Sequence, residues 1–276
     1  MGFKTLKCAP KSEHGFTCYT TQQLLDMKDL WNKKHPHHRI KDGEDDPKKI
    51  WNFFKKEFQY QCKHERCWIS KQFNSIPDIK LHSIFAPVAP KEWDTDPKTW
   101  LSNFDIEKIM KLYEDKYKQF TFLGATPIDY DTKLNDNEYV NNKLAMFDRS
   151  YYERYSPIVG IVFNTDKHNK PGEHWFAMVI RFHRNECIFF DSYGDKAPRK
   201  IKRFVKDNIP DLNFIENTKQ HQYGNSECGM YCIYFIIQMI KGRLLDTLNK
   251  SIIKDKKMNN LRKEIFNAYK DVYKVN

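Results

Sequence analysis

The chain has 276 residues, of which 40% are hydrophobic and 15% aromatic, and it carries a formal net charge of +11. So many aromatic residues exclude an intrinsically disordered chain, and the length suits one large domain or a domain with a smaller companion. No apolar run reaches the length that crosses a bilayer, so we expect no membrane span.

The positive charge favours contact with polyanions such as nucleic acids. The lysines and arginines, however, occur in many small groups, and no motif that reads DNA or RNA accompanies them. We therefore expect most of these side chains to lie on solvated helix faces, and any DNA contact to be non-specific.

The seven cysteines are odd in number and irregularly spaced, and the N-terminus lacks the apolar core of a signal peptide. Because disulfides are rare in reducing compartments, these features predict free thiols and a reducing environment. Cys62 and Cys67, with His64 between them, could instead bind zinc together with the upstream cysteines. Their spacing matches no compact zinc module, so we expect no metal site.

Residues 1–85 are predicted to form a mainly helical arm domain. Thr20 or Thr21 can cap one helix, and Asp46 with Pro47 can begin a second helix as cap and first residue. The apolar residues that follow each cap recur at helical spacing, which predicts one buried face per helix. This segment contains no catalytic constellation, so we expect a recognition role for the arm at most.

A proline-containing stretch without a clear hydrophobic period follows, and we place a second domain at residues 86–276. Its first helix is predicted to begin after a cap at Ser102 or Asn103 and to carry apolar residues at helical spacing. Trp100 lies just before this cap, where a large ring could face a cleft instead of the core.

Strand patterns dominate the middle of the second domain. Residues 158–163 and 175–182 are apolar on both faces, which predicts two central strands of a covered sheet. A basic amphipathic helix is predicted over residues 199–207, and a further strand over residues 212–215.

A hairpin brings two polar residues together. Residues 187–190 form a predicted strand after a turn at Arg184 and Asn185. His174 stands just before the strand that precedes this turn, and Asp191 stands just after the strand that follows it. Antiparallel pairing brings both side chains to one edge of the sheet, with an offset of about three residues. Such a pair can serve a thiol nucleophile. The alternative is a surface histidine and a strand-ending aspartate with no shared role.

The segment from Gln222 to Met239 begins polar and becomes almost wholly apolar from Cys228 onward. We interpret it as a turn followed by a buried helix, with Cys228 in the first turn. The helix dipole and unpaired N–H groups favour the thiolate there, and the loop is expected to leave the sulfur accessible. The alternative is a buried structural cysteine, which is how we interpret Cys232 inside the apolar run.

Four short motifs occur in an order that is typical of one family. They are His174-Trp175, Asp191, Gln222 and Cys228-Gly229. This order resembles the adenain and ubiquitin-like-protein protease clan of cysteine peptidases. Residues 100–103, Trp-Leu-Ser-Asn, also resemble the Trp-Leu-Asn-Asp signature of that clan, but depart from it at Asn103. The resemblance is closest to the polyprotein-maturation proteases of large cytoplasmic DNA viruses, of the African swine fever virus type.

The resemblance implies an α+β fold for the second domain, with a central mixed sheet flanked by helices. It implies that Cys228 attacks a peptide carbonyl, that His174 transfers the proton, and that Asp191 orients the imidazole. Gln222 and the backbone N–H of Cys228 would bind the oxyanion. No cofactor or metal is required. The implied substrate-binding residues are Trp100, Asn103, Trp175 and Gly229.

The predicted function is therefore a cysteine endopeptidase that cleaves viral structural polyproteins after Gly-Gly or similar small pairs during virion maturation. Trp100 and Trp175 would leave a slot too narrow for a Cβ atom, which fits such substrates. The expected location is the host cytoplasm and the virion. Two alternatives remain: a protease that releases a ubiquitin-like modifier, and a basic scaffold that binds nucleic acid or virion proteins without catalysis.

Overall fold

The computed structural model describes residues 3–12, 15–76 and 81–273. Contacts between residues divide the chain into two compact units. The terminal unit combines Met1–Asp94 with Glu264–Asn276, and the central unit is Thr95–Lys263. Segments from both ends of the sequence therefore build one unit, and a contiguous segment builds the other.

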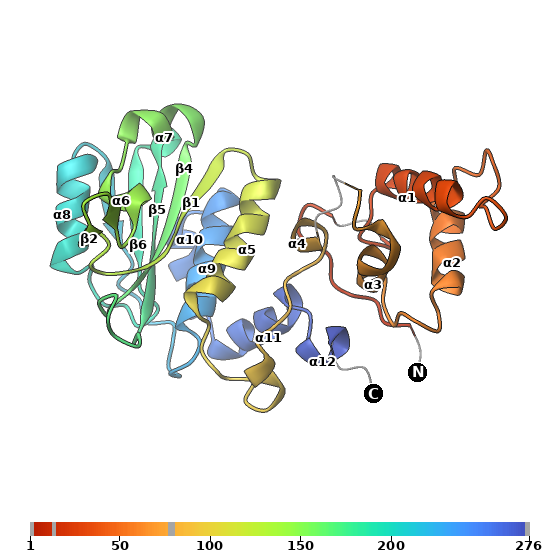
Figure 1. Ribbon diagram of the computed structural model, residues 1–276. Coiled ribbons are helices and arrows are strands. Elements are labelled where there is room, and N and C mark those ends of the chain that lie inside the picture. The colour runs from red at the N-terminus through yellow and green to blue at the C-terminus, as the bar shows by residue number, and fades with distance from the viewer. Residues whose placement is uncertain (1–2, 13–14, 77–80, 274–276) are drawn as a thin grey trace. The chain divides into compact units, whose positions relative to one another are not determined.

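The terminal unit is mainly helical, as the sequence predicts (Figure 1). Its elements are α1 (Thr21–Lys34), α2 (Pro47–Glu57), α3 (Arg66–Trp68), the π-helical turn η1 (Ile69–Phe73), α4 (Leu81–Ile84), the 3-10 turn η2 (Lys91–Asp94) and α12 (Tyr269–Val272). Thr20 caps α1 in a capping box with Gln23. Asp46 caps α2, and Pro47 is its first residue. The two predicted helix starts are thus confirmed.

A buried carboxylate organises the aromatic core of the terminal unit. Glu65 is 2% exposed and lies near Trp68, which is fully buried. Its Oε2 atom accepts hydrogen bonds from the Thr17 hydroxyl and from the Trp51 indole, both at 2.6 Å. Burial raises the pKa of Glu65. The donors offset part of the desolvation cost and orient the segments around the carboxylate.

Four cysteines of the terminal unit form disulfides, which corrects the prediction of free thiols. Cys8 pairs with Cys18, and Cys62 pairs with Cys67. The zinc alternative is wrong for the same reason, because a disulfide sulfur is not a thiolate ligand. Number and spacing could not reveal the pairs, since pairing depends on how the chain turns in space. The cysteines of the central unit are free, as predicted: Cys187, Cys228 and Cys232.

The boundary between the units differs from the predicted one at residue 85. The chain enters the central unit after Asp94 and returns to the terminal unit at Glu264. The buried Asn267 side chain holds the returning segment. Its Oδ1 accepts from the Lys7 N–H at 2.7 Å, and its Nδ2 donates to the Ala86 carbonyl at 2.9 Å. One amide thus joins three segments that are far apart in sequence, a contact that no local pattern predicts.

The central unit has the predicted α+β fold, built on a mixed sheet (Figure 1). Its strands are β1 (Phe120–Pro127), β4 (Ile158–Asn164), β5 (Trp175–Arg181), β6 (Glu186–Phe190) and β7 (Asn213–Glu216), with a separate hairpin of β2 (Lys133–Asn135) and β3 (Glu138–Tyr139). Its helices are α5 (Asn103–Lys116), α6 (Asn142–Ala145), α7 (Arg149–Tyr155), the 3-10 turn η3 (Phe182–Arg184), α8 (Arg199–Asn208), α9 (Cys228–Ile240), α10 (Leu245–Asn249) and α11 (Asp255–Ile265).

Within the described residues, the main sheet has the strand order β1-β4-β5-β6-β7. The two outer pairs, β1 with β4 and β6 with β7, are parallel, whereas β5 is antiparallel to both of its neighbours. Strands β4 and β5 are buried along their whole length, as their apolar pattern predicts. The predicted strands coincide with β4, β5, β6 and β7 to within one residue at each end.

The edge strand β1 is not among the predicted strands, because glycine and proline interrupt its pattern. Gly124 has a φ of +122° and lies where the pairing of β1 with β4 shifts register. Pro127 is the last residue of the strand. A bulge and a strand end on the sheet edge tolerate residues that a central strand excludes.

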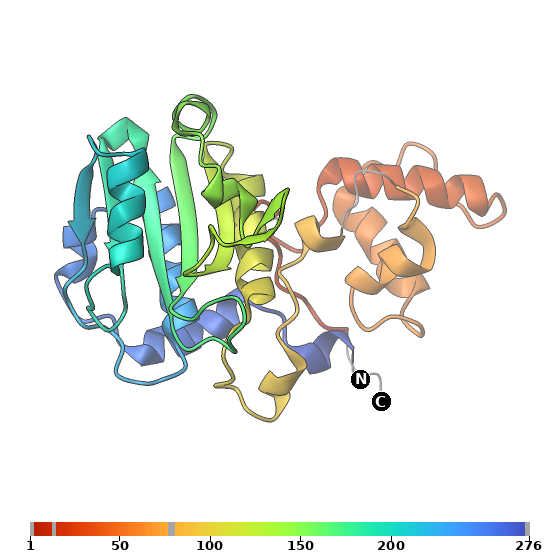
Figure 2. The same cartoon turned by 60° about the vertical axis from the view of Figure 1, so that its left-hand side comes forward.

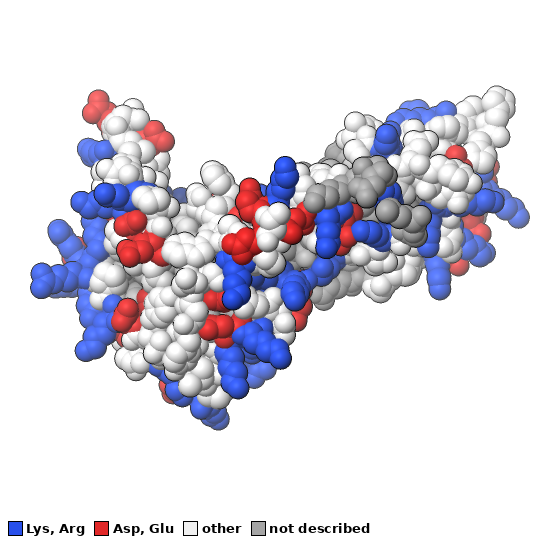
Figure 3. All heavy atoms as spheres, turned by 90° about the horizontal axis from the view of Figure 1, so that it is seen from below, with Lys and Arg blue, Asp and Glu red and all other residues white. Residues whose placement is uncertain are grey.

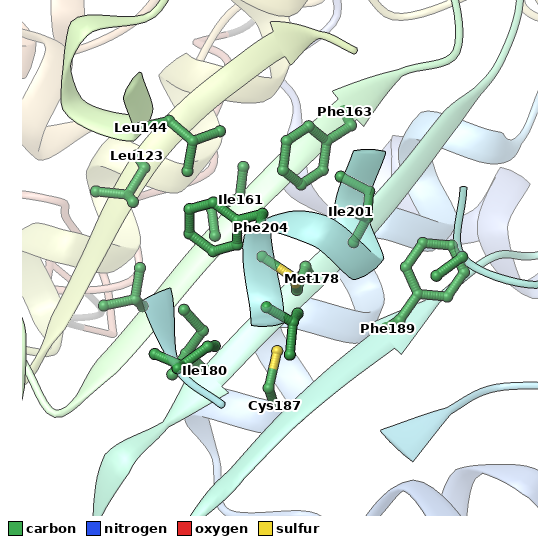
Figure 4. Packing of buried hydrophobic residues seen from close by; sticks show 14 of the residues in the cluster. Leu123, Leu144, Ile161, Phe163, Met178, Ile180, Cys187, Phe189, Ile201 and Phe204 are labelled. Atoms are coloured by element: carbon green, nitrogen blue, oxygen red, sulfur yellow. The ribbon is translucent and has the colours of Figure 1, made fainter. Parts of the chain in front are cut away.

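Helices cover both faces of the main sheet (Figure 1, Figure 2). On one face, strand residues such as Ile161 pack with Ile201 and Phe204 of α8 (Figure 4). On the other face, Phe190 of β6 stacks on Phe235 of α9, with ring centroids 4.6 Å apart. This second contact fixes α9, which begins at Cys228, against the sheet. No helix in the described ranges is both long enough and apolar enough to cross a membrane.

Thiol counting tests the disulfide pairing. Protein unfolded without reductant should give three alkylated cysteines, and protein unfolded after reduction should give all seven. Mass spectrometry of the unreduced digest should recover peptides joined through Cys8–Cys18 and Cys62–Cys67. Seven alkylated cysteines in protein purified without reductant would contradict the pairing.

Candidate active site

The predicted histidine and aspartate meet at the sheet edge where β5 begins and β6 ends. His174 immediately precedes β5, and Asp191 immediately follows β6. Because Ala177 pairs with Phe190, the histidine and the aspartate are offset by two positions, fewer than the three expected. The His174 Nε2 and Asp191 Oδ2 atoms are 2.9 Å apart. The register of two buried strands therefore creates this contact.

Cys228 is the first residue of α9, as predicted. No side chain caps this end of α9, so the first N–H groups of the helix can serve a bound anion. The sulfur lies close enough to the His174 ring to contribute to its raised pKa. Since Nε2 of the ring faces Asp191, Nδ1 is the nitrogen left for the sulfur. The imidazole thus contacts the carboxylate and lies near the thiol.

The electrostatics of this cluster favour a charged imidazole. Burial lowers the pKa of His174, but hydrogen bonds to Asp191 and to Cys228 outweigh burial and raise the pKa from 6.5 to about 9. The ring is therefore positively charged at neutral pH. A positively charged ring near a thiol is typical of the surroundings of reactive cysteines.

Tyr193, which the sequence analysis does not single out, holds the imidazole and the carboxylate in place. Its ring stacks on the His174 ring, with centroids 4.8 Å apart. Its N–H donates to Asp191 Oδ1 at 2.7 Å, and its hydroxyl donates to the Gly224 carbonyl at 2.9 Å. The sequence offers one signal for this residue, an aromatic side chain two positions after a strand-ending aspartate.

Gln222 is buried beside the same cluster, and its side-chain amide is already engaged. Its Oε1 accepts from the Ser192 hydroxyl at 2.7 Å. Its Nε2 donates to the Gly224 carbonyl at 2.9 Å and to the Tyr193 hydroxyl at 3.3 Å. The longer of these contacts is the one that an oxyanion could replace. The oxyanion role of Gln222 stays a prediction.

Helix α11 fixes the loop that precedes the cysteine. Asp255 Oδ2 accepts hydrogen bonds from the N–H groups of Tyr223 and Gly224, at 3.1 and 2.9 Å. One turn later, Asn259 Nδ2 donates to Glu227 Oε1 at 3.1 Å. The loop is therefore held at both ends by one helix that lies later in the sequence.

Arg262, on the same face of α11, ties this loop to a second segment. Its guanidinium is 3% exposed and donates to the Ser226 carbonyl and, at 2.8 Å, to the Thr99 carbonyl. The segment that leads to Trp100 is thereby joined to the loop before the cysteine. In the sequence, these polar residues of α11 read as a solvated helix face, which is why the sequence analysis misses them.

The predicted substrate-binding residues Trp175 and Gly229 pack together next to the cysteine. The Trp175 indole donates to the Leu101 carbonyl at 3.1 Å. A Cβ atom at Gly229 would lie 3.2 Å from Leu101 and 3.5 Å from Trp175. Glycine thus lets the first turn of α9 approach both side chains, and the two predicted residues form a buried wall of the site.

The other two predicted substrate-binding residues, Trp100 and Asn103, line a pocket of 410 Å³ to which Trp175 also contributes. Trp100 is 39% exposed, as expected of a ring that faces a cleft. Ser102 caps α5 in a capping box with Asp105, so Asn103 is free of that task. Three of the four residues predicted to bind substrate, Trp100, Asn103 and Trp175, therefore line the pocket. The fourth, Gly229, packs against Trp175.

Access to the sulfur differs from the expectation. Cys228 is 2% exposed, although the sequence predicts an accessible thiol after an open loop. The loop is drawn inward because its backbone groups bond to Asp255, Arg262 and Tyr193. The loop or a neighbouring side chain must therefore move before a large molecule reaches the sulfur.

A family model described as YopJ Serine/Threonine acetyltransferase matches residues 104–272. The matched segment is more than half of the chain, and it includes the histidine, the aspartate and the cysteine of the cluster.

Two viral proteins are similar in sequence over most of the chain. A protein named as a thiol protease of Acanthamoeba polyphaga mimivirus is 26% identical over 288 residues, which cover 94% of this chain and 92% of that protein. A cysteine protease of African swine fever virus is 24% identical over 246 residues, which cover 79% of this chain and 88% of that protein.

A crystal structure of an African swine fever virus protease has the same fold. It matches with a TM-score of 0.67 and 18% sequence identity, over 95% of this chain and 96% of that one. The expected architecture, a mixed sheet flanked by helices with a helical N-terminal region, is confirmed by this match.

Thiol labelling tests the contact between the cysteine and the histidine. Near pH 7, iodoacetamide should alkylate Cys228 faster than Cys187 or Cys232, and His174→Ala should slow the alkylation of Cys228 about tenfold, because the variant lacks the imidazole that accepts the thiol proton. The matched control, His183→Ala at an exposed turn, should keep the parental rate. Mass spectrometry measures the rate of Cys228 alkylation in each protein. Equal rates in the parent and in His174→Ala would contradict an interaction between His174 and Cys228.

The raised pKa of His174 predicts how stability depends on pH. The protonated ring stabilises the folded state fully below about pH 6.5, and this contribution is lost as pH rises toward about 9. Between about pH 6 and about pH 10, the urea midpoint of the parent should therefore fall more than that of His174→Gln. His183→Gln should behave like the parent. Identical falls in all three proteins would show that the ring gains no proton affinity on folding.

Proposed function

The chain belongs to the YopJ Serine/Threonine acetyltransferase family, and on this premise we propose that it transfers acyl groups through a thioester on Cys228. We propose further that the acyl group comes from a peptide bond, so that the protein is a cysteine protease. The observation that carries the proposal is the hydrogen bond between the His174 imidazole and the Asp191 carboxylate, with the Cys228 thiol near the same ring.

The choice of peptide hydrolysis over acetyl transfer rests on the relatives that cover both units of the chain. The mimivirus protein and the African swine fever virus protein cover 94% and 79% of the chain, and both are named as proteases. Acetyl transfer to a serine or threonine hydroxyl is the second candidate, and the description of the family model favours it. Both reactions pass through an acyl thioester and differ in the acyl donor and the acceptor.

In the proposed mechanism, the Cys228 thiolate attacks the carbonyl carbon of the scissile bond. The S–C bond forms as the carbonyl oxygen becomes an oxyanion. The His174 imidazolium then donates its proton to the leaving nitrogen as the C–N bond breaks. In the second half, His174 takes a proton from the water that attacks the thioester, which releases the carboxylic acid and restores the thiolate. Asp191 stabilises the charged ring in both halves.

The oxyanion requires donors close to the sulfur. We assign one to the Cys228 N–H at the start of α9. We assign the second to Gln222, whose Nε2 would exchange the 3.3 Å contact with the Tyr193 hydroxyl for the oxyanion. Loss of one such donor typically lowers a rate by about 10²–10³.

Glycine is the residue that we propose before the cleaved bond. Trp100 and Trp175 both line the pocket, and Trp175 packs against Gly229, the neighbour of the nucleophile. Two indoles in the lining of the pocket would restrict the width available to a substrate side chain. A Gly-Gly pair, which lacks Cβ atoms, can lie flat in such a slot.

The proposed biological role is the maturation of viral structural polyproteins in the host cytoplasm and in the virion. The viral sources of the two relatives support it. Release of a ubiquitin-like modifier is the alternative substrate class, because another African swine fever virus relative is named as a SUMO-1 cysteine protease. A non-catalytic scaffold is less well supported, since binding alone does not require a thiol, an imidazole and a carboxylate in contact.

Contact with DNA is a separate proposal that rests on the net charge of +11. Figure 3 shows basic and acidic side chains interspersed on the face that it presents. Ion pairs such as Lys200–Asp131 and Arg149–Asp211 use part of the positive charge. Any DNA contact should therefore be weak and should weaken steeply with added salt.

Peptide cleavage tests the proposed function. The parent should cut peptides after Gly-Gly, and Cys228→Ala should abolish the cut, because alanine has no nucleophilic sulfur. Replacing the glycine before the cut by Ala or Leu should lower kcat/KM about tenfold or more, which corresponds to a clash worth over about 1.4 kcal/mol. Equal rates for Gly, Ala and Leu would refute the narrow slot.

Controls separate the candidate functions. Cys232→Ala, a change at a second buried thiol of α9, should leave cleavage nearly unchanged. Incubation with an acetyl thioester and a serine-containing peptide should give no acetylated peptide if the protein is a protease. Acetylation without cleavage of any Gly-Gly peptide or viral precursor would reverse the order of the two candidates.

A further inference from the structure

The loop of residues 165–173 connects β4 to β5 and ends directly before His174. It forms part of the 410 Å³ pocket that Trp100 and Trp175 also line. The proposed chemistry uses none of its residues. Its position beside the glycine slot makes it a candidate for contact with other parts of the substrate.

Asn164, the last residue of β4, anchors both ends of the 165–173 loop. Its side chain is buried, and its Oδ1 accepts from the N–H groups of Asp166 and Glu173, at 2.9 and 3.1 Å. Gly172 passes close to it: a Cβ atom there would lie 2.9 Å from Asn164 Nδ2, at a φ of +93° that favours glycine. The base of the loop is therefore fixed by buried hydrogen bonds.

Asp129 anchors the middle of the loop. Its Oδ1 accepts from the His168 N–H at 2.9 Å, and its Oδ2 lies 2.7 Å from His168 Nδ1. Burial raises the pKa of Asp129, but the hydrogen bonds from His168 outweigh burial and lower it. Asp129 is thus committed to His168 and does not neutralise the lysines on either side of that histidine.

Lys167 and Lys170 give the pocket its charge. Both line the pocket and are exposed, and in the part of the chain that the structure describes neither forms an ion pair. Asp166 is the one acidic residue among the lining residues, all of which are described. Because the loop is already anchored, its two ammonium groups can bind a carboxylate with little further loss of backbone entropy.

We propose that this pocket binds an acidic side chain of the substrate, located within about three residues before the Gly-Gly pair, or about 10 Å of extended chain. The inference rests on the proposed protease function and its glycine slot, because Trp100 and Trp175 line the same pocket as the 165–173 loop. Residues that precede the glycines then pass the 165–173 loop. The substrate class becomes an acidic segment followed by Gly-Gly.

Peptides that differ in one charge test the proposal. Each carries Glu, Gln or Lys at one of the three positions before Gly-Gly. At low salt, the Cys228→Ala variant should bind the best Glu peptide about three- to tenfold more tightly than its Gln counterpart, and the Lys peptide more weakly, as measured by fluorescence anisotropy. Salt at about 0.5 M should remove the difference, because it screens exposed charges.

Charge reversal in the loop supplies the matched pair of variants. Lys167→Glu/Lys170→Glu, made in the Cys228→Ala background, should bind the Lys peptide more tightly than the Glu peptide. The control, Lys118→Glu/Lys206→Glu, changes the net charge equally at exposed lysines outside the pocket and should keep the parental order. A control that also reverses the order would trace the preference to net charge and overturn the proposal.

Cleavage by the parent separates this inference from the function on which it rests. If the Glu, Gln and Lys peptides are all cleaved with the same kcat/KM and bind equally tightly, the acidic preference is overturned and the protease function stands. If Glu peptides bind most tightly and need the loop lysines, but are never cleaved, the acidic-binding pocket is supported and the protease function is overturned. Absence of both cleavage and preference would overturn both.

Discussion

The hydrogen bond between His174 and Asp191 is the contact on which the rest of the site depends. It exists because β5 and β6 are antiparallel neighbours in a register that pairs Ala177 with Phe190. A slip of one residue would turn every side chain of a strand to the other face. The apolar residues that fix the register under α8 and α9 therefore also fix the geometry of the polar edge. The same two strands therefore build the core and hold Asp191 beside His174, which raises the pKa of the imidazole.

Apolar packing places the elements of the site, and directional hydrogen bonds orient its groups. The polar contacts converge on the backbone of Gly224. Its N–H bonds to Asp255, and its carbonyl accepts from both Tyr193 and Gln222. Contacts from the segment after β6, from the segment before α9 and from α11 thus meet at one residue ahead of the nucleophile. Networks of this kind specify one geometry because each member loses a partner if another moves.

The sequence predicts those parts of the structure that depend on local pattern. The central strands are predictable because they are apolar on both faces, and the site is predictable where a residue ends or begins an element, as His174, Asp191 and Cys228 do. Contacts between distant segments are not predictable in this way. Three features depend on which segments the fold brings together. They are the hydrogen bonds from α11 to the loop before Cys228, the hydrogen bonds of Asn267, and the two disulfides. The accessibility of Cys228 is mispredicted for the same reason, since a polar loop can be drawn inward by distant partners.

The three-way junction at Asn267 has a consequence for the order in which the protein folds during translation. Met1–Asp94 leave the ribosome before Thr95–Lys263, and Glu264–Asn276 follow them. The backbone groups of Lys7 and Ala86 that bond to Asn267 must wait for that residue to be synthesised. The contiguous unit can fold as it emerges, in the usual domain-by-domain manner. The hydrogen bonds that join Lys7 and Ala86 to Asn267, although they belong to a unit synthesised first, can form only after the whole of the later unit has been made.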